Sequence, residues 1–549
     1  MPDPSPKTIA AMVAPTNLAV MAQSLWALAS TGIIRPYRPD RLYRLAKTLV
    51  QWGTGPAGGY TALAARMPHS IGLIDELGSL TFDQIHRESN AVARGLERLG
   101  VHEGDSVAIM CRNHRWFIEA TVGVAKLGAD VVYLNTAFAG PQLVDVLERE
   151  QPIAVIHDEE FTELMSGVPD QVHRLIAWTD SDALRTGTLS DLVATEDDAD
   201  MRVPDREART TILTSGTTGD PKGASRGAGS LDAAASLVSR IPLRHGMTVH
   251  VAAPMFHTWG WAHLNLSMLI GSTLVLRRRF DPADFLQTVA GLRCDGAVVI
   301  PVMLQRVLDL PAEQRRVDVS SLKVVAASGS ALPGDLASRW MDEFGDTLYN
   351  IYGSTECAWA TIATPQELRR APGTSGRPPI GTQVELYDRD DQRVTTGAGR
   401  IFVGNSMLFE GYTGGGNKSV IDGLMATGDV GRFQDGLLFV EGRDDEMIVS
   451  GGENVYPQEV EDCLARRREI AEVAVLGVAD DDFGQRLRAY VVLREGAHVS
   501  EEALQDHVKA SLARYKVPRD IWFLPELPRN ATGKILKRDL AALDDPAPR

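Results

Sequence analysis

The chain has few cysteines and no excess of positive charge. Its 549 residues include four cysteines, which never form a C-x-x-C pair: Cys111, Cys294, Cys357 and Cys463. This spacing excludes zinc ribbons and disulfide scaffolds, and it favours a reducing, cytoplasmic location. Acidic side chains outnumber Lys and Arg by 72 to 56, giving a net charge of −16. Nucleic acid is therefore excluded as a partner, because binding it requires a positive field.

The chain also lacks an uninterrupted apolar run of the roughly 20 residues that a membrane-spanning helix needs. The most apolar stretch, residues 9–34, is broken by Pro15, Asn17 and Gln23. A signal peptide is not predicted either, because Asp3 and a single Lys7 replace the usual basic cluster.

A basic stretch follows this apolar segment, and a helix is predicted to begin at Asp40 as its N-cap. Residues 1–60 hold six basic and two acidic side chains, so the remainder carries −20. Apolar residues beside cations predict a peripheral contact with an anionic membrane. The alternative is an N-terminal extension that folds back on the body.

Strands and helices alternate beyond residue 60. A helix is predicted over residues 80–100, where Thr81 and Gln84 form a capping-box pattern and Gly100 ends the element. A second helix is predicted over 116–127. Short apolar runs predict strands at 107–110, 131–134, 153–157, 249–253, 273–276, 297–300, 322–326 and 347–351. Such buried runs separated by helices are typical of an α/β fold with mainly parallel sheets.

The pattern changes beyond Gly442, where short strands accompany two helices predicted at 457–467 and 501–514. We therefore expect three segments: an N-terminal extension (1–60), a large multi-sheet domain (61–443) and a small, mobile α+β domain (444–549). The glycines at 414–416 predict a flexible surface loop.

One loop predicts a phosphate site. Residues 214–223 read TSGTTGDPKG and follow a short apolar run. The glycines let backbone N–H groups converge on phosphate oxygens, and hydroxyls and a lysine add further donors. The candidate phosphate ligands are Thr214, Ser215, Gly216, Thr217, Thr218, Gly219 and Lys222. The loop is not a Walker A motif, which needs G-x-x-x-x-G-K-[ST]; the alternative is a ligand-free turn.

A second pattern overlaps this loop. Gly223, Ser225 and Gly227 have the G-x-S-x-G spacing of a nucleophile elbow. That motif requires a strand running into its first glycine, whereas loop-forming residues precede Gly223. A serine hydrolase is therefore not predicted.

Five motifs in order resemble the adenylate-forming superfamily, which comprises acyl-CoA synthetases, nonribosomal peptide adenylation domains and beetle luciferases. They are TSGTTGDPKG, NIYGSTE at 350–356, TGD at 427–429, GRDDEMIVSGGENVYPQEVE at 442–461 and PRNATGKILKRDL at 528–540. The resemblance covers roughly residues 61–540. It implies the two-domain α/β fold, with ATP and CoA as co-substrates and Mg²⁺ as cofactor.

The resemblance also implies a nucleotide site. Tyr352 would lie against the adenine, and Asp429 would accept the ribose hydroxyls, since a carboxylate can take two hydrogen bonds. Glu356 and Thr214 would hold Mg²⁺, which prefers hard oxygen ligands. The remaining implied contacts to nucleotide are Gly329, Ser330, Ala331, Gly353, Ser354, Thr355 and Arg443.

The resemblance also implies roles for residues of the small domain, which would move during the reaction. The resemblance implies that Lys534 contacts the substrate carboxylate and the α-phosphate, that Asp445 is the hinge, and that Gly451 and Gly452 lie at the thiol entrance. The catalytic set is thus Lys534, Thr214, Glu356 and Lys222. One departure is Val449, which stands where several fatty acyl relatives carry a lysine. No role for that lysine can be transferred.

The predicted reaction joins a carboxylic acid to CoA through an acyl-AMP. In fatty acyl relatives His257 matches a tunnel residue and Trp261 a gating tryptophan, so a medium- or long-chain fatty acid is predicted; the aromatics could instead be ordinary core. No acidic residue near them would receive an amino-acid ammonium. The alternatives are an aryl or branched acid, an acyl-AMP ligase that serves a carrier protein, and a non-enzymatic lipid-binding relative. A homodimer is left open.

Overall fold

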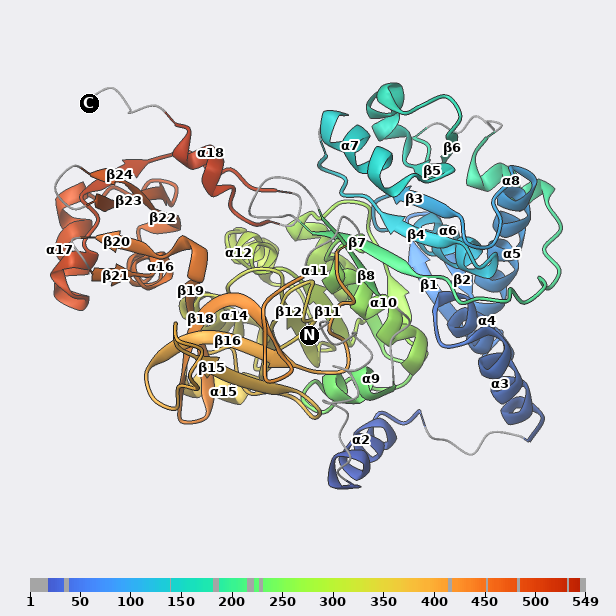
Figure 1. The fold of residues 1–549 in the computed structure, drawn as a ribbon, viewed down its shortest axis with the longest axis horizontal. Coiled ribbons are helices and arrows are strands. Elements are labelled where there is room, and N and C mark those ends of the chain that lie inside the picture. The colour runs from blue at the N-terminus through green and yellow to red at the C-terminus, as the bar shows by residue number, and fades with distance from the viewer. Residues whose placement is uncertain are drawn as a thin grey trace.

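The structure is a computed structural model. It describes residues 18–33, 39–138, 140–180, 187–214, 222–226, 231–412, 417–450, 453–480, 484–530 and 533–543. The predicted loop at 414–416 lies outside these residues. Figure 1 shows a large body formed by the N-terminal three quarters of the chain, with a smaller C-terminal part beside it.

Two mainly parallel sheets form the body. The first has the order β6-β5-β3-β4-β7-β8, and only its edge strand β8 is antiparallel. Its strands are β3 (Ser106–Met110), β4 (Asp130–Tyr133), β5 (Ala154–His157), β6 (His173–Ile176), β7 (Thr210–Thr214) and β8 (Lys222–Arg226). The helices with it are α5 (Phe82–Arg98), α6 (Arg115–Lys126), α7 (Gly140–Glu150) and α8 (Leu189–Thr195).

The second sheet has the order β14-β13-β12-β11-β9-β10-β1-β2, antiparallel at both edges. Its strands are β1 (Ile71–Asp75), β2 (Gly78–Thr81), β9 (Thr248–Val251), β10 (Thr273–Val275), β11 (Gly296–Val299), β12 (Val324–Ala327), β13 (Leu348–Tyr352) and β14 (Thr361–Ala363). Its helices are α9 (Leu231–Val238), α10 (Thr258–Ile270), α11 (Pro282–Gly291), α12 (Pro301–Leu308), α13 (Ala312–Arg315), α14 (Gly334–Phe344) and α15 (Pro365–Arg370).

Two smaller sheets complete the chain. One contains β15 (Gln383–Tyr387), β16 (Ala398–Gly404), β17 (Val420–Ile421), β18 (Leu424–Gln434) and β19 (Leu437–Arg443). The C-terminal sheet contains β20 (Ile448–Ser450), β21 (Glu453–Val455), β22 (Ile470–Asp480), β23 (Gly484–Leu493) and β24 (Asp520–Phe523), with α16 (Pro457–Ala465), α17 (Glu501–Ser511) and α18 (Lys537–Ala541). It has its own apolar core, as expected for a separate small domain.

The predicted fold class is therefore confirmed, and every predicted strand exists within two residues of its predicted ends. The capping box at Thr81 and Gln84 is present, but the residues before Phe82 belong to strand β2. The expected helix thus begins two residues late.

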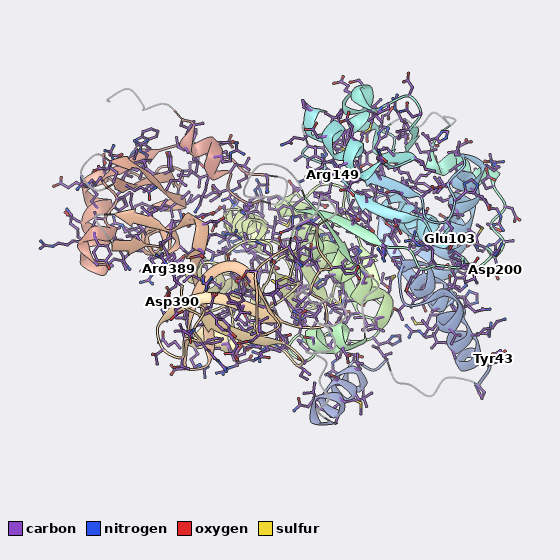
Figure 2. All side chains as sticks on the ribbon, viewed as in Figure 1. Tyr43, Glu103, Arg149, Asp200, Arg389 and Asp390 are labelled. Atoms are coloured by element: carbon purple, nitrogen blue, oxygen red, sulfur yellow. The ribbon has the colours of Figure 1, made fainter. Side chains whose placement is uncertain are left out.

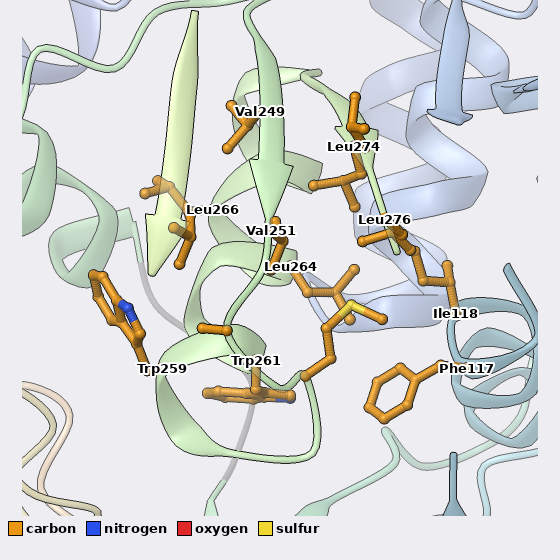
Figure 3. Packing of buried hydrophobic residues seen from close by; sticks show 14 of the residues in the cluster. Phe117, Ile118, Val249, Val251, Trp259, Trp261, Leu264, Leu266, Leu274 and Leu276 are labelled. Atoms are coloured by element: carbon orange, nitrogen blue, oxygen red, sulfur yellow. The ribbon is translucent and has the colours of Figure 1, made fainter. Parts of the chain in front are cut away.

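The main core joins the two large sheets. Helix α6 is buried along its whole length, because it lies between the sheets instead of on the surface. Figure 3 shows Phe117 and Ile118 of α6 facing the cluster that Trp261 and Leu264 of α10 form with the neighbouring strands.

Three N-terminal helices precede the first sheet: α2 (Leu18–Ser30), α3 (Pro39–Trp52) and α4 (Pro56–Arg66). Asp40 lies in the first turn of α3 instead of capping it, because Pro39 already begins the helix. The boundary predicted after residue 60 falls inside α4, where Tyr60 and Leu63 are each 2% exposed. None of the helices in the described part of the chain is long and apolar enough to cross a membrane.

Candidate active site

A single cavity of about 1980 Å³ lies between the body and the small domain. It collects residues from distant parts of the sequence. The predicted site residues that line it are His257, Trp261, Gly329, Ser330, Ala331, Tyr352, Gly353, Ser354, Thr355, Glu356, Asp429, Arg443, Asp445 and Lys534.

Three side chains, linked by one hydrogen bond and one ion pair, form one wall. Tyr352 ends strand β13, and its hydroxyl donates to Asp429 Oδ2 at 2.6 Å. Asp429 and Arg443 face each other across β18 and β19, with 3.6 Å between Arg443 Nη1 and Asp429 Oδ1. The sheet register therefore fixes an acceptor and a cation side by side. Such a pair can bind both hydroxyl groups and anions.

Burial dominates the electrostatics of this wall. It raises the pKa of Asp429, although the Tyr352 hydrogen bond and the charges of Arg443 and Lys534 oppose that shift. Burial and the neighbouring Asp429 raise the pKa of Tyr352 well above its ordinary value. Tyr352 therefore remains a neutral donor with an apolar ring at neutral pH.

Glu356 has a partner that the sequence analysis missed. The Tyr412 hydroxyl donates to Glu356 Oε1 at 2.6 Å. Burial would raise the pKa of Glu356, but this hydrogen bond and the charge of Lys418 lower it below its ordinary value. The cavity thus contains an ionised carboxylate. Tyr412 and Lys418 also line the cavity, and the only signal for them was their position beside the glycines at 414–416.

The turn between Tyr352 and Glu356 depends on a glycine. A Cβ on Gly353 would lie 2.1 Å from the Ala358 carbonyl oxygen and 2.6 Å from Trp359 Cα. No side chain fits there, because both neighbours are backbone atoms. Gly353 therefore allows the chain to fold back tightly and to present Glu356 to the cavity.

Lys534 reaches the cavity from the small domain through a tight turn. Its backbone N–H donates to Asn530 Oδ1 at 2.9 Å, and Gly533 adopts a φ of +77°. A Cβ on Gly533 would lie only 2.7 Å from Val302 Cγ1 and 3.0 Å from Ile300 Cδ1, both in the body. The turn is thus docked tightly against the large domain, and it carries Lys534 with it.

The Lys534 charge acts on two other residues of the cavity. It opposes the rise in the pKa of Asp429, and together with burial it lowers the pKa of His257 to about 4. The charge of Lys534 therefore influences both Asp429 and His257. His257 is neutral at neutral pH.

The cavity continues from His257 into an arm with mostly apolar walls. Trp261, 4% exposed, stands on α10 one turn after His257. Helix α4 packs against both α10 and α3, and the cavity is lined by residues on and beside these helices. We call this set the apolar arm: Ala262, Asn265, Met268 and Leu269 of α10, Gly59, Ala62, Leu63 and Arg66 of α4, and Ile33, Leu45 and Leu49. This end of the cavity suits an extended apolar ligand.

Two salt bridges lie where the two domains meet. Arg443 pairs with Asp445 in the segment that joins β19 to the small domain, at 3.0 Å from Arg443 Nε to Asp445 Oδ1. Arg494 of the small domain pairs with Asp309 of the body at 2.8 Å. Both pairs are partly exposed, so each contributes only about 0–1 kcal/mol.

Part of the predicted site lies outside the described residues. The loop positions Ser215, Gly216, Thr217, Thr218 and Gly219 belong to this part, as do Gly451 and Gly452. The strands that flank the loop are described: Thr214 ends β7 and pairs with Lys222, which begins antiparallel β8. Leu213 of β7 lines the cavity, so this strand reaches it.

The same hairpin bears on the nucleophile-elbow pattern. Gly223 and Ser225 lie within strand β8, paired with Leu213 and Thr211 of β7. An elbow needs its serine on a sharp turn between a strand and a helix. The strand geometry therefore agrees with the expectation that this is not a serine hydrolase.

Another polar cluster lies away from the cavity. Potential ligand atoms of Cys111, His114 and Asp158 lie within 4.8 Å of one another, and all three residues are buried. His114 Nε2 and Asp158 Oδ1 are hydrogen-bonded at 2.8 Å. None of the three lines the cavity. This hydrogen bond joins two members of the cluster within the packed core, whereas the buried His114 Nδ1 has no hydrogen-bond partner among the described residues.

Comparison with known families agrees with this geometry. The sequence profile of the AMP-binding enzyme family matches residues 61–413, and that of the AMP-binding enzyme C-terminal domain matches 459–534. The chain belongs to the AMP-binding enzyme family. The predicted superfamily resemblance is thereby confirmed, and Lys534 is the last residue of the matched C-terminal domain.

Relatives in this family act on different acids. A feruloyl-CoA synthase of an Amycolatopsis species is 32% identical over 498 residues, covering 88% of this chain and 98% of the relative. A long-chain-fatty-acid–CoA ligase of Mycobacterium tuberculosis is 29% identical over 467 residues, covering 83% and 92%. The structure of o-succinylbenzoate CoA synthetase from Bacillus subtilis with its acyl-adenylate has a TM-score of 0.77 at 26% identity, covering 88% and 98%.

Proposed function

We propose that this member of the AMP-binding enzyme family is an AMP-forming acid–CoA ligase. The observation that carries the proposal is the continuity of one cavity. Tyr352, Asp429, Glu356 and Lys534 line one end, and an arm with mostly apolar walls leads away from His257. A nucleotide and an apolar acid could therefore meet beside one lysine. The CoA ligases among the relatives support the same reaction.

Different residues of the cavity would bind different groups of ATP. The Tyr352 ring would stack against adenine beside the backbone of Gly329, Ser330 and Ala331. Asp429 would accept the ribose hydroxyls, and Arg443 would contact ribose or phosphate. The loop from Thr214 to Lys222 would hold the phosphates through its N–H groups, hydroxyls and lysine.

The donor set fits Mg²⁺. Glu356 is ionised and faces the cavity, and a carboxylate is a hard oxygen ligand of the kind that Mg²⁺ binds together with substrate phosphates. We propose that Glu356 and Thr214 hold this ion. When bound, it would neutralise part of the phosphate charge.

The first half-reaction needs anions brought together. A carboxylate oxygen attacks the α-phosphorus of ATP, the bond from that phosphorus to the α,β-bridging oxygen breaks, and acyl-AMP and pyrophosphate form. Lys534 would contact the carboxylate and the α-phosphate, so its ammonium offsets the charge that accumulates in the transition state. Neutral His257 would leave this cation without a competing positive charge. Positioning and charge neutralisation suffice for such a transfer.

The second half-reaction requires Lys534 to leave the site so that the thiol can reach the acyl carbon. We propose that the small domain rotates about Asp445, withdrawing Lys534 and bringing Gly451 and Gly452 to a thiol entrance. The CoA sulfur then attacks the acyl carbon, AMP leaves and the thiol proton is released. The weak salt bridges between the domains are compatible with such a hinge motion.

We propose a medium- or long-chain fatty acid as the substrate, since the apolar arm extends from Trp261 past α4 to Leu45 and Leu49. An aryl acid is the second candidate. It is favoured by the feruloyl-CoA synthase among the relatives and by the aromatic wall near Trp261.

A panel of carboxylic acids tests both levels of the proposal. Pyrophosphate release is measured with MgATP for alkyl acids of rising length and for hydroxycinnamic acids, each with and without CoA. We expect CoA-dependent AMP release, with the highest kcat/KM for alkyl acids. Release of pyrophosphate without thioester formation would instead identify an acyl-AMP ligase. No turnover with any acid would contradict the proposed activity.

A further inference from the structure

Exposed large apolar side chains are concentrated on two N-terminal helices. Twelve such residues are exposed in the described part of the chain, and six of them lie on α2 and α3. They are Met21, Leu25, Trp26, Tyr43, Leu49 and Val50. The two helices contain only 27 residues. This concentration is unlike the scattered exposure usual for a protein surface, and it marks an interaction surface.

Helix α2 exposes large apolar side chains and buries small ones, the reverse of an ordinary surface helix. It contains no charged residue, and it buries the small side chains of Ser24 and Ala27 while packing against α9. Leu25 and Trp26 are 56% and 74% exposed. A helix that serves only the core would bury these large side chains instead.

Helix α3, the next helix along the chain, adds positive charge to exposed apolar residues of its own. It packs mainly against α4, and Tyr43 and Val50 are 70% and 87% exposed. Arg44 and Lys47 lie among them on exposed turns. Figure 2 shows Tyr43 at the outer end of α3, pointing away from the body. Residues 1–60 are positive, whereas the rest of the chain carries −20.

Residues on and beside the same helices line part of the cavity. Leu45 and Leu49 of α3 and Ile33, which follows α2, line the apolar arm together with Met268 and Leu269 of α10. Leu49 is also 38% exposed, so it belongs to both the arm and the outer surface. Figure 1 shows α2 at the lower edge of the body and α3 at its right-hand edge, with the small domain at the left.

We propose that α2 and α3 form a docking surface for an anionic lipid bilayer, and that the acid enters the apolar arm from that bilayer. An apolar helix flanked by a basic amphipathic helix suits the headgroup region, and tryptophan and tyrosine are favoured at this depth. Helix α2 has 13 residues, too few to span a bilayer. The helices therefore lie on the membrane.

A second copy of this chain is a poorer occupant. A twofold contact pairs each surface with itself. It would set Arg44 and Lys47 of two copies against each other, whereas an anionic headgroup neutralises them. The docking surface is independent of the reaction. Only the entry of the acid rests on the proposed function.

Vesicle co-sedimentation of the full chain tests the docking surface. Vesicles of phosphatidylcholine are compared with vesicles that also contain phosphatidylglycerol. Two double variants are used, Leu25→Ser with Trp26→Ser and Arg44→Glu with Lys47→Glu. Leu77→Ser is the matched control, because Leu77 is 55% exposed but lies in the turn between β1 and β2, away from the cavity.

We expect the wild type and the Leu77 variant to pellet with anionic vesicles. Each double variant should partition about tenfold or more weakly, since each basic residue near an anionic surface and each buried apolar side chain contributes on the order of a few-fold or more. Absence of pelleting by the wild type would overturn the proposal. So would equal pelleting of all variants, or light scattering showing that the substitutions dissociate a dimer without changing vesicle binding.

The entry of the acid is tested with two substrates. A long-chain acid is supplied within anionic vesicles, and a short acid is supplied in solution. The Leu25/Trp26 variant should turn over the vesicle-borne acid about tenfold more slowly while keeping its rate with the soluble acid. Equal losses with both acids would overturn the entry route. If neither acid reacts with any protein but vesicle binding persists, the proposed function fails and the docking surface stands.

Discussion

Replacing Gly533 with alanine should separate the two half-reactions of this enzyme. The new Cβ would lie 2.7 Å from Val302 Cγ1 and 3.0 Å from Ile300 Cδ1, at a φ of +77°. The left-handed backbone costs about 1–2 kcal/mol for a residue with a Cβ. The overpacked contact adds about 1–3 kcal/mol. Both penalties fall on the docked position of the Lys534 turn.

The expected defect follows from these two terms. Since 1.4 kcal/mol corresponds to tenfold, the docked arrangement should become about 30- to 4000-fold less favourable. ATP–pyrophosphate exchange, which uses the docked Lys534, should fall within that range. Thioester formation from supplied acyl-AMP should change much less, because that step does not need this position.

A second substitution checks the physical cause. Val302→Ala removes the closest clashing atom. The double variant should therefore regain the part of the exchange rate that the close contact costs, about five- to 150-fold. It should still show the loss caused by the left-handed backbone. The Val302→Ala single variant completes the double-mutant cycle, because it gives the effect of that substitution alone. Wild-type exchange by Gly533→Ala would refute the reasoning. Equal defects in the single and double variants would show that the contact with Val302 is not the cause.

Three further predictions concern charged groups. Lys534→Ala should lower pyrophosphate exchange by orders of magnitude while sparing thioester formation from acyl-AMP, and unchanged exchange would contradict its role. Tyr412→Phe removes a hydrogen bond that lowers the pKa of Glu356, so the acid limb of the exchange profile should shift upward by about one to two pH units; an unshifted limb would exclude Glu356 as the titrating group. Burial lowers the pKa of His250 and His263 to about 4. The unfolded chain therefore binds more protons below about pH 6.5, and the melting temperature should fall as pH drops below that value. His263→Leu should make this slope shallower, and an identical slope would contradict the buried neutral state.

Much of this architecture was predictable because local sequence determines it. The strands of the parallel sheets are short apolar runs that stay buried on both faces, so their positions could be read to within two residues. Tyr352 and Asp429 were predicted from separate motifs. The structure adds the 2.6 Å hydrogen bond between them.

Other features depend on tertiary packing, which the sequence pattern does not specify. Tyr412 and Glu356 are 56 residues apart, and no motif in either segment indicates that they form a hydrogen bond. Composition showed that residues 9–34 are apolar, but packing decided that the small side chains of α2 would be buried and Trp26 exposed. The close approach of Gly533 to Val302 joins two domains. The motif at 528–540 contains Gly533 but does not indicate this contact.

The most direct test of the central claim is a crystal structure with a nonhydrolysable acyl-adenylate analogue. The account predicts that the purine lies against Tyr352, that the ribose hydroxyls contact Asp429, and that the acyl group follows the arm past Trp261. An analogue bound elsewhere, or an acyl group directed away from α10, would contradict it.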